Sequence, residues 1–174
     1  MQGYNMSPRL LARIAELPNY VALKNVVGDD LDHYHETRRL CSGKIVVSDP
    51  SEKLFLENYT KHGQRAFISS PEPMLLQSRE WQPMNDYVRL ADKGNLSAAA
   101  QVNADLEIVR SALSACLGLL GWYKYTALSK YWFDLQGLAS GCVVYPQQEL
   151  TAQEKAFVKE QFDACGLGKA HQAA

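Results

Sequence analysis

The sequence has no excess of basic residues. Its 174 residues include 18 Lys and Arg against 19 Asp and Glu, which gives a formal net charge of −1 with neutral histidines. Proteins that bind nucleic acid usually carry a basic patch, and segments that lie on membrane surfaces carry clusters of Lys and Arg. The balanced charge argues against both classes, so we expect neither nucleic acid nor a membrane as a partner.

Cysteine is scarce, and no two cysteines are close in sequence. A zinc or redox site is usually built on a Cys-x-x-Cys pair, which is missing from the set Cys41, Cys116, Cys142 and Cys165. A chain of this length with 47% hydrophobic residues can bury an ordinary core without disulfides. We therefore expect reduced thiols and no metal site.

A long apolar run is missing as well. The most apolar stretch, Ser111–Tyr123, is shorter than the roughly 20 residues that a helix needs to cross a bilayer. The first residues begin no apolar segment of the kind found in secretory signals. These two absences predict a cytoplasmic protein.

Helical and strand patterns alternate in the first part of the chain. Ser7-Pro8 is a typical helix start, because serine caps helices well and proline is favoured at the first helical position. Helices are predicted over 8–17, 31–41 and 51–62, and strands over 20–24, 44–48 and 66–69. Such alternation is typical of βαβ units with a parallel sheet.

After Pro71 and Pro73 the pattern becomes helical. Helices are predicted over 81–93, 96–120, 123–138 and 151–165, with glycines at most of the breaks. We place a domain boundary here: residues 1–94 form the α/β part, and residues 95–174 form a helical region packed on it. Three parallel strands cannot close a barrel, so the α/β part is a small open sheet or a portion of a (β/α)8 barrel.

Lys24 is the first candidate for chemistry. It ends an apolar strand, and parallel α/β folds bind ligands at the carboxyl ends of their strands. A lysine held against apolar walls has a lowered pKa, and its neutral amine can attack a ketone to form a Schiff base. The competing interpretation is a lysine that extends from the strand end into solvent.

Other polar and aromatic groups are weaker candidates. Tyr4 could relay a proton if a pocket positions it. His33 and His35, with Asp30, Asp32 and Glu36 nearby, suggest metal ligands. Residues two apart on a helix face different ways, so we expect a solvated acidic helix face instead. The aromatic group at 122–133 indicates core packing or a subunit interface.

The order of these segments resembles a known family. Tyr4-Asn5, the helix after Ser7-Pro8, the Leu17-Pro18-Asn19 turn and the strand ending in Leu23-Lys24 resemble the dihydrodipicolinate synthase / N-acetylneuraminate lyase family. The segments Gly63–Ser69 and Gly137–Glu154 resemble its last barrel strand and its C-terminal helices. The resemblance implies the C-terminal part of a TIM (β/α)8 barrel, with about three to four parallel strands, followed by an all-helical region.

The family resemblance also implies a function. It makes Lys24 the amine that forms an imine with pyruvate or another 2-oxo acid, and Tyr4 the adjacent proton relay. Substrate-binding positions would be Asn5, Ser48, Ile68 and Ser69. No cofactor or metal is implied, since the lysine imine is itself the electron sink. We expect a homo-oligomeric lyase or aldolase.

Two alternatives remain open from the sequence. In the first, this is a truncated family member without catalysis, lacking the front half of the barrel, which only assembles with itself or a partner chain. In the second, it is an unrelated open-sheet domain that binds a ligand at its strand ends. Asp49-Pro50-Ser51, where many family members carry a Gly-Asp-Asp-like turn, leaves the substrate undefined.

Overall fold

A computed structural model describes residues 5–28 and 30–168 of the chain. The chain divides into two compact units, Met1–Ser70 and Pro71–Ala174. The predicted boundary at residues 94 and 95 falls inside the second unit, and as a statement about domains it stays a prediction. No helix in these two described stretches is long and apolar enough to cross a bilayer.

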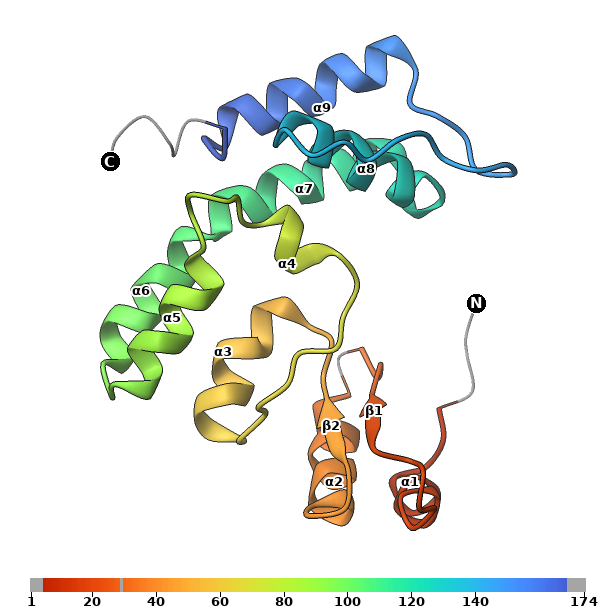
Figure 1. The fold of residues 1–174 in the computed structure, drawn as a ribbon, viewed down its shortest axis with the longest axis vertical. Coiled ribbons are helices and arrows are strands. Elements are labelled where there is room, and N and C mark those ends of the chain that lie inside the picture. The colour runs from red at the N-terminus through yellow and green to blue at the C-terminus, as the bar shows by residue number, and fades with distance from the viewer. Residues whose placement is uncertain (1–4, 29, 169–174) are drawn as a thin grey trace. The chain divides into compact units, whose positions relative to one another are not determined.

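The first unit contains a pair of parallel strands among three helices (Figure 1). In chain order its elements are α1 (Pro8–Ile14), β1 (Ala22–Lys24), α2 (Leu31–Cys41), β2 (Val46–Ser48) and α3 (Glu52–Lys61). The register pairs Ala22 with Val46, Leu23 with Val47 and Lys24 with Ser48. Both strands therefore end together.

Helices α1 and α2 begin at side-chain caps. The Ser7 hydroxyl accepts a hydrogen bond from the backbone N–H of Leu10, and Pro8 stands at the first helical position, as predicted. The Asp30 carboxylate accepts from the N–H of His33 at the start of α2. Such caps satisfy N–H groups that have no partner within the helix.

A small apolar core holds α1 and α2 against the strands. Its buried members are Leu11, Ala15, Tyr34, Cys41 and Val47. Leu11 and Ala15, the residue that ends α1, are four residues apart, so their side chains lie on the same side of this helix. Helical spacing of Leu10, Leu11, Ile14 and Leu17 predicts an apolar face for this helix. Of these four residues Leu11 is buried and Leu17 is exposed, and Ala15 completes the buried side.

The prediction of a third strand over 66–69 is wrong. Among the described residues the sheet has two strands, and residues 66–69 are irregular. Side chains take the backbone groups that a ladder would use: the N–H of Ile68 donates to Ser48 Oγ, and the carbonyl of Ala66 accepts from Gln64 Nε2. The apolar composition of this segment predicted burial but not the hydrogen-bond partners.

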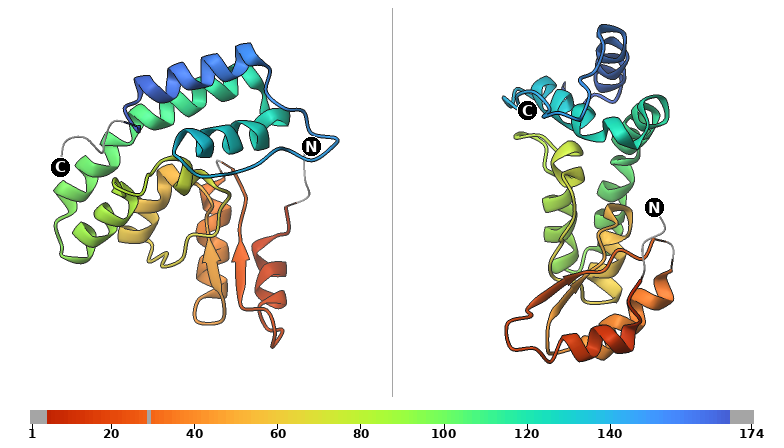
Figure 2. Two further views of the ribbon diagram at one scale, coloured as in Figure 1. Left: turned by 45° about the horizontal axis from the view of Figure 1, so that its top comes forward. Right: turned by 90° about the vertical axis from the view of Figure 1, so that its right-hand side faces the viewer.

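The second unit is helical. Its elements are α4 (Glu72–Leu75), α5 (Pro83–Asp92), α6 (Leu96–Asp105), α7 (Glu107–Leu120), the 3₁₀ turn η1 (Trp122–Lys124), α8 (Tyr125–Leu135) and α9 (Ala152–Ala164). Helices α5 and α6 pack as a hairpin, and α9 packs on α7 and α8 (Figure 2). Thr151 and Glu154 form a reciprocal capping box that begins α9.

Trp132 is the centre of the core of this unit. Its ring is fully buried and meets the ring of Phe162 edge-on, with centroids 5.0 Å apart. Its indole Nε1–H donates to the carbonyl of Leu75 at 2.9 Å. The other end of the aromatic segment is different, because Trp122 and Tyr123 are 74% and 71% exposed.

The single helix predicted over 96–120 is two helices that meet at Leu106. The Leu106 side chain is fully buried. The guanidinium of Arg110 donates to the carbonyl and the side-chain oxygen of Asn103, at 2.9 and 2.7 Å, near the end of α6. Arg110, which belongs to α7, thus donates to a carbonyl group that would accept from a backbone N–H if the helix continued.

The four cysteines carry no disulfide. Cys41, Cys116 and Cys165 are buried, and Cys142 is exposed. Burial raises the pKa of the Cys116 thiol to about 11, with a smaller contribution from Cys165. The buried cysteines behave as small apolar side chains.

Candidate active site

The carboxyl ends of the two parallel strands bring Lys24 and Ser48 into register. The apolar run before Lys24 forms β1, and the N–H of Asn25 continues the ladder by donating to the carbonyl of Ser48 at 2.9 Å. Ser48 is fully buried, whereas the side chain of Lys24 is exposed. The amine predicted as the nucleophile therefore stands at the ligand-binding end of the strands, in contact with solvent.

Ser48 connects the strand end to the segment that follows α3. Its hydroxyl accepts from the N–H of Ile68 at 2.9 Å and from Gln64 Nε2 at 3.2 Å, and it donates to the carbonyl of Asp49. Three of its neighbours are thus fixed by one side chain. Two predicted site residues, Ser48 and Ile68, are brought together by this hydroxyl.

Gln64 is a buried amide that the sequence analysis missed. Its Oε1 accepts from the Tyr34 hydroxyl at 2.5 Å and from the N–H of Asp49 at 3.2 Å. Its Nε2 lies 3.0–3.2 Å from three acceptors: Ser48 Oγ and the carbonyl oxygens of Asp49 and Ala66. A single glutamine therefore joins α2, the end of β2 and the following segment. Flanked by Gly63 and Arg65, it gives no sequence signal of burial.

Asp49 extends this polar group toward α3. Its carboxylate accepts from Asn58 Nδ2 at 3.0 Å and from the N–H of Ser51 at 2.9 Å. The Asp-Pro-Ser sequence predicted a helix cap here. Ser51 is the N-cap residue of α3 but makes no side-chain cap hydrogen bond, and the Asp49 carboxylate binds the N–H of Ser51 instead. Burial raises the pKa of Tyr34, while the nearby Arg38 guanidinium opposes that rise. The tyrosine hydroxyl therefore stays protonated and can donate to Gln64.

Asn25 follows Lys24 and contributes an unusual group. Its side chain is 5% exposed, and its Nδ2 has no hydrogen-bond partner among the residues that the structure describes. A buried donor without a partner costs free energy, so such groups mark positions where a ligand or further polar atoms would be stabilising. Sequence reasoning passed over Asn25, although its position directly after a strand-end lysine was a usable signal.

The remaining predicted residues differ in their contacts. Ser69 Oγ donates to the carbonyl of Pro50 at 2.9 Å, beside the Ser48 group. Asn5 is exposed, and within residues 5–28 and 30–168 no hydrogen bond joins it to that group. Tyr4, the predicted proton relay, lies outside the described residues.

The two histidines of α2 have different partners, as their spacing predicted. His33 Nε2 donates to the carbonyl of Met6 at 2.8 Å, whereas the ring of His35 contacts that of His62 in a tilted arrangement. In the described part of the chain, no three His, Cys, Asp or Glu side chains come together in a group that could hold a metal ion.

Comparison with known proteins gives a structural match. No family model matches the sequence, and no curated protein matches it either. Three solved structures share the fold: an N-acetylneuraminate lyase from Proteus mirabilis (TM-score 0.68, 20% identity) and dihydrodipicolinate synthases from Bacillus anthracis (0.64, 18%) and Thermotoga maritima (0.63, 18%). They match 95%, 91% and 92% of this chain, respectively.

The chain spans about half the length of these structures, with 51%, 49% and 51% of their residues covered. The resemblance predicted from the sequence is therefore confirmed in the fold. The match is also consistent with a partial barrel followed by a helical region. At this level of identity the comparison establishes shared architecture, and the roles of individual residues are a separate question.

Proposed function

We propose that this chain is the C-terminal part of a protein of the dihydrodipicolinate synthase / N-acetylneuraminate lyase family, and that its activity is that of a Schiff-base lyase or aldolase. The substrate would be pyruvate or another 2-oxo acid, and the nucleophile Lys24. One observation carries the proposal: within a fold shared with these enzymes, a lysine ends a parallel strand directly opposite Ser48.

The chemistry follows from a primary amine and a ketone. Lys24 Nζ adds to the C2 carbonyl carbon of the 2-oxo acid, and the resulting carbinolamine loses water to give a protonated imine. The imine withdraws electrons from the adjacent carbon, which loses a proton to form an enamine. The enamine carbon can then form a bond to an aldehyde, or the reverse sequence can break that bond. No metal or organic cofactor is needed, because the iminium is the electron sink.

The neighbouring residues have roles that follow from their contacts. Ser48 fixes the N–H of Ile68, and Ser69 is held against Pro50. In the proposed active form, the segment 68–69 would face the bound 2-oxo acid. The unpartnered Nδ2 of Asn25, the residue after Lys24, is a further buried donor at this strand end. Tyr4 would move the proton during imine formation, and Asn5 would bind the substrate beside it.

The exposure of Lys24 sets a requirement. An amine attacks only when it is neutral, and removal of solvent is the usual way to make a lysine neutral near pH 7. We therefore propose that further protein covers Lys24 in the active form, either from the same polypeptide or from a second copy in a homo-oligomer. The proposed setting is the cytoplasm.

Borohydride trapping with pyruvate tests the proposal. The reagent reduces an imine to a stable secondary amine, so the chain gains the mass of pyruvate less one water plus two hydrogens. Peptide mapping should place the adduct on Lys24 and not on Lys53, which is also exposed. Lys24→Arg should abolish the adduct, and Lys53→Arg should leave it unchanged. Equal labelling of both lysines contradicts the proposal, and so does the absence of an adduct on a folded, assembled form in which Lys24 is covered.

A non-catalytic protein is the second candidate. It is favoured by the exposed Lys24 and by the exposed apolar residues Trp122 and Tyr123, which are suited to assembly. In that case, pyruvate and borohydride would leave the mass of the folded chain unchanged.

A further inference from the structure

One face of α2 carries a stripe of basic and hydroxyl side chains. His35, Arg38, Arg39 and Ser42 follow the spacing i, i+3, i+4 and i+7, which places them on the same side of a helix. Together with His62, the residue after α3, these side chains line an open depression of about 440 Å³. The sequence analysis identified this helix only as a solvated face.

The charge around this depression is positive. A second hollow of about 240 Å³ shares Arg38 and Ser42 with the first and adds Arg65 to the lining. No carboxylate lines either hollow among the described residues. Glu36 is the nearest acid in sequence, and both of its oxygens accept from the Arg39 guanidinium at 2.7 Å. Arg38 is held by a neutral group, since it donates to the Tyr34 hydroxyl at 3.3 Å and so keeps its full charge.

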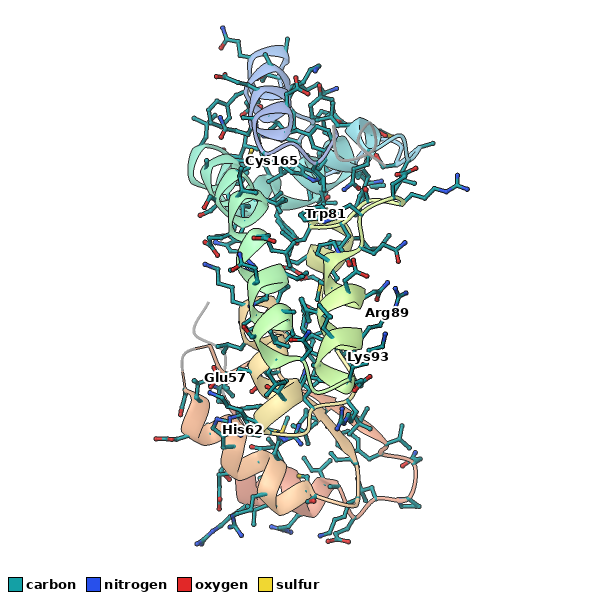
Figure 3. All side chains as sticks on the ribbon, turned by 90° about the vertical axis from the view of Figure 1, so that its left-hand side faces the viewer. Glu57, His62, Trp81, Arg89, Lys93 and Cys165 are labelled. Carbon is teal, nitrogen blue, oxygen red and sulfur yellow. The ribbon has the colours of Figure 1, made fainter. Side chains whose placement is uncertain are left out.

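The two imidazoles are crowded against these cations. The rings of His35 and His62 lie 4.1 Å apart between centroids. The pKa of His62 is lowered first by burial and then by the charges of His35, Arg38 and Lys61, while Glu57 opposes the shift. Figure 3 labels His62 and Glu57, both of which belong to the α3 region. An anion placed here would relieve the repulsion and favour protonated imidazoles.

We propose that this depression, named here the α2–α3 basic site, binds a small dianion of the phosphate class. Guanidinium groups match the oxygens of a tetrahedral anion, protonated imidazoles add two ring N–H donors, and Ser42 adds a hydroxyl donor. A dianion fits better than a single carboxylate because at least two guanidinium groups and two imidazoles converge on one hollow.

The α2–α3 basic site is separate from the candidate active site. The second hollow is lined by Gly43, Ile45 and Val46, which lead into β2, whereas Lys24 and Ser48 stand where the strands end. The site therefore lies toward the amino end of β2 and does not depend on the proposed lyase activity. A ligand there would leave the 2-oxo acid site open.

Titration of the intact chain with inorganic phosphate and with sulfate tests the proposal, with the imidazole NMR signals of His35 and His62 as the readout. Both anions should shift these signals in a saturable manner. Arg39→Gln should weaken binding about tenfold, because it removes one charge-assisted contact. Arg13→Gln, the matched control, removes an exposed guanidinium from α1 and should leave affinity unchanged. If Arg39→Gln and Arg13→Gln weaken anion binding equally, the effect comes from the net charge of the chain, and the proposed site is contradicted.

Sulfate separates the titration of the protein from that of the ligand, since it stays doubly charged between pH 5 and 8, whereas phosphate does not. Sulfate affinity should rise as pH falls through the pKa of His62, and bound sulfate should raise that pKa. His62→Gln should remove most of this pH dependence while retaining part of the affinity. The absence of saturable shifts, or a pH dependence that His62→Gln leaves unchanged, would overturn the proposal.

Discussion

The two units bury different kinds of side chain. Seven of the nine buried polar or charged residues in the described chain belong to the first unit, namely Asn25, Thr37, Ser48, Asp49, Glu52, Asn58 and Gln64. The second unit buries Lys124 and Ser129, and its other buried residues are hydrophobic, Met84, Cys116 and Cys165 among them. The first unit is the smaller of the two, so the contrast does not follow from size.

This contrast separates orientation from bulk stability. Hydrogen-bonded interiors fix groups in direction, because each donor must meet its acceptor within a narrow range of distance and angle. Apolar interiors are less directional, and their stabilisation grows with the area removed from water. The unit that carries the strand-end residues is thus the one organised by hydrogen bonds, and the helical unit is organised by burial.

Removal of the largest side chain from the helical core should have the greatest effect. Trp132→Ala deletes a fully buried ring, its edge contact with Phe162 and its hydrogen bond to Leu75. We expect a loss of about 4 kcal/mol in the free energy of unfolding, from the lost burial and the cavity. Urea unfolding followed by circular dichroism measures it.

Trp122→Ala is the control, since that ring is exposed, and it should change stability by less than about 0.5 kcal/mol. Similar losses from the two substitutions would show that the second unit has no dominant buried core.

Replacement of the central amide of the first unit tests the other half of the contrast. Gln64→Leu keeps the volume but leaves the Tyr34 hydroxyl and the N–H of Asp49 without their acceptor. We expect a loss of about 2–3 kcal/mol, because buried groups without partners are costly. The same unfolding experiment applies, with the backbone amide signals of Ile68 and Ser69 followed by NMR.

Gln101→Leu offers a matched comparison, because Gln101 is exposed and bonds only to Asp105 within α6. It should be close to neutral. If Gln64→Leu is also neutral, the interior of the first unit is not organised by hydrogen bonds.

The smallest effect concerns an ion pair of the second unit, between Lys124 and Glu154. Lys124 Nζ meets Glu154 at 2.5 and 2.7 Å, with side chains 8% and 21% exposed. The pKa of Glu154 is lowered first by Lys124 and then by the N–H of Thr151. Its contribution to stability is therefore present above its unfolded pKa and is lost as pH falls below about 4.5 through the lower folded value.

Glu154→Gln should accordingly flatten the loss of thermal stability between neutral and acidic pH. Glu160→Gln changes an exposed acid on the same helix and should retain the wild-type profile. If the pH dependence of thermal stability is the same for Glu154→Gln and the wild type, the ion pair between Lys124 and Glu154 does not contribute to the stability of this unit.

The sequence predicted those features that depend on nearby residues. The bounds of α2 agree with the predicted helix over 31–41, and those of α9, Ala152–Ala164, lie within one residue of the predicted 151–165. Local caps and periodicity suffice for such elements. The predictions were wrong where contacts between residues far apart in sequence determine the local structure. The hydroxyl of Ser48 accepts from the N–H of Ile68, 20 residues away, and the segment 66–69 is irregular. Leu106 interrupts the helix predicted over 96–120 without any glycine or proline to signal it.

The candidate site was predictable only in outline. Lys24 and Ser48 stand opposite each other because both end strands, a relation that alternation of helices and strands implies. The amide of Gln64 and the unpartnered group of Asn25 depend on contacts made after folding, and composition gives no sign of them.

The four cysteines differ in exposure, and Cys142 is the one that solvent and oxidants can reach in the folded chain. Three sulfur atoms are buried, and at neutral pH the Cys116 thiol is protonated, so reagents that attack thiolates meet Cys142 first. A single exposed thiol can form one disulfide with another chain. Disulfide formation between folded chains therefore stops at a covalent dimer. The same property makes Cys142 a natural position for attaching a single probe.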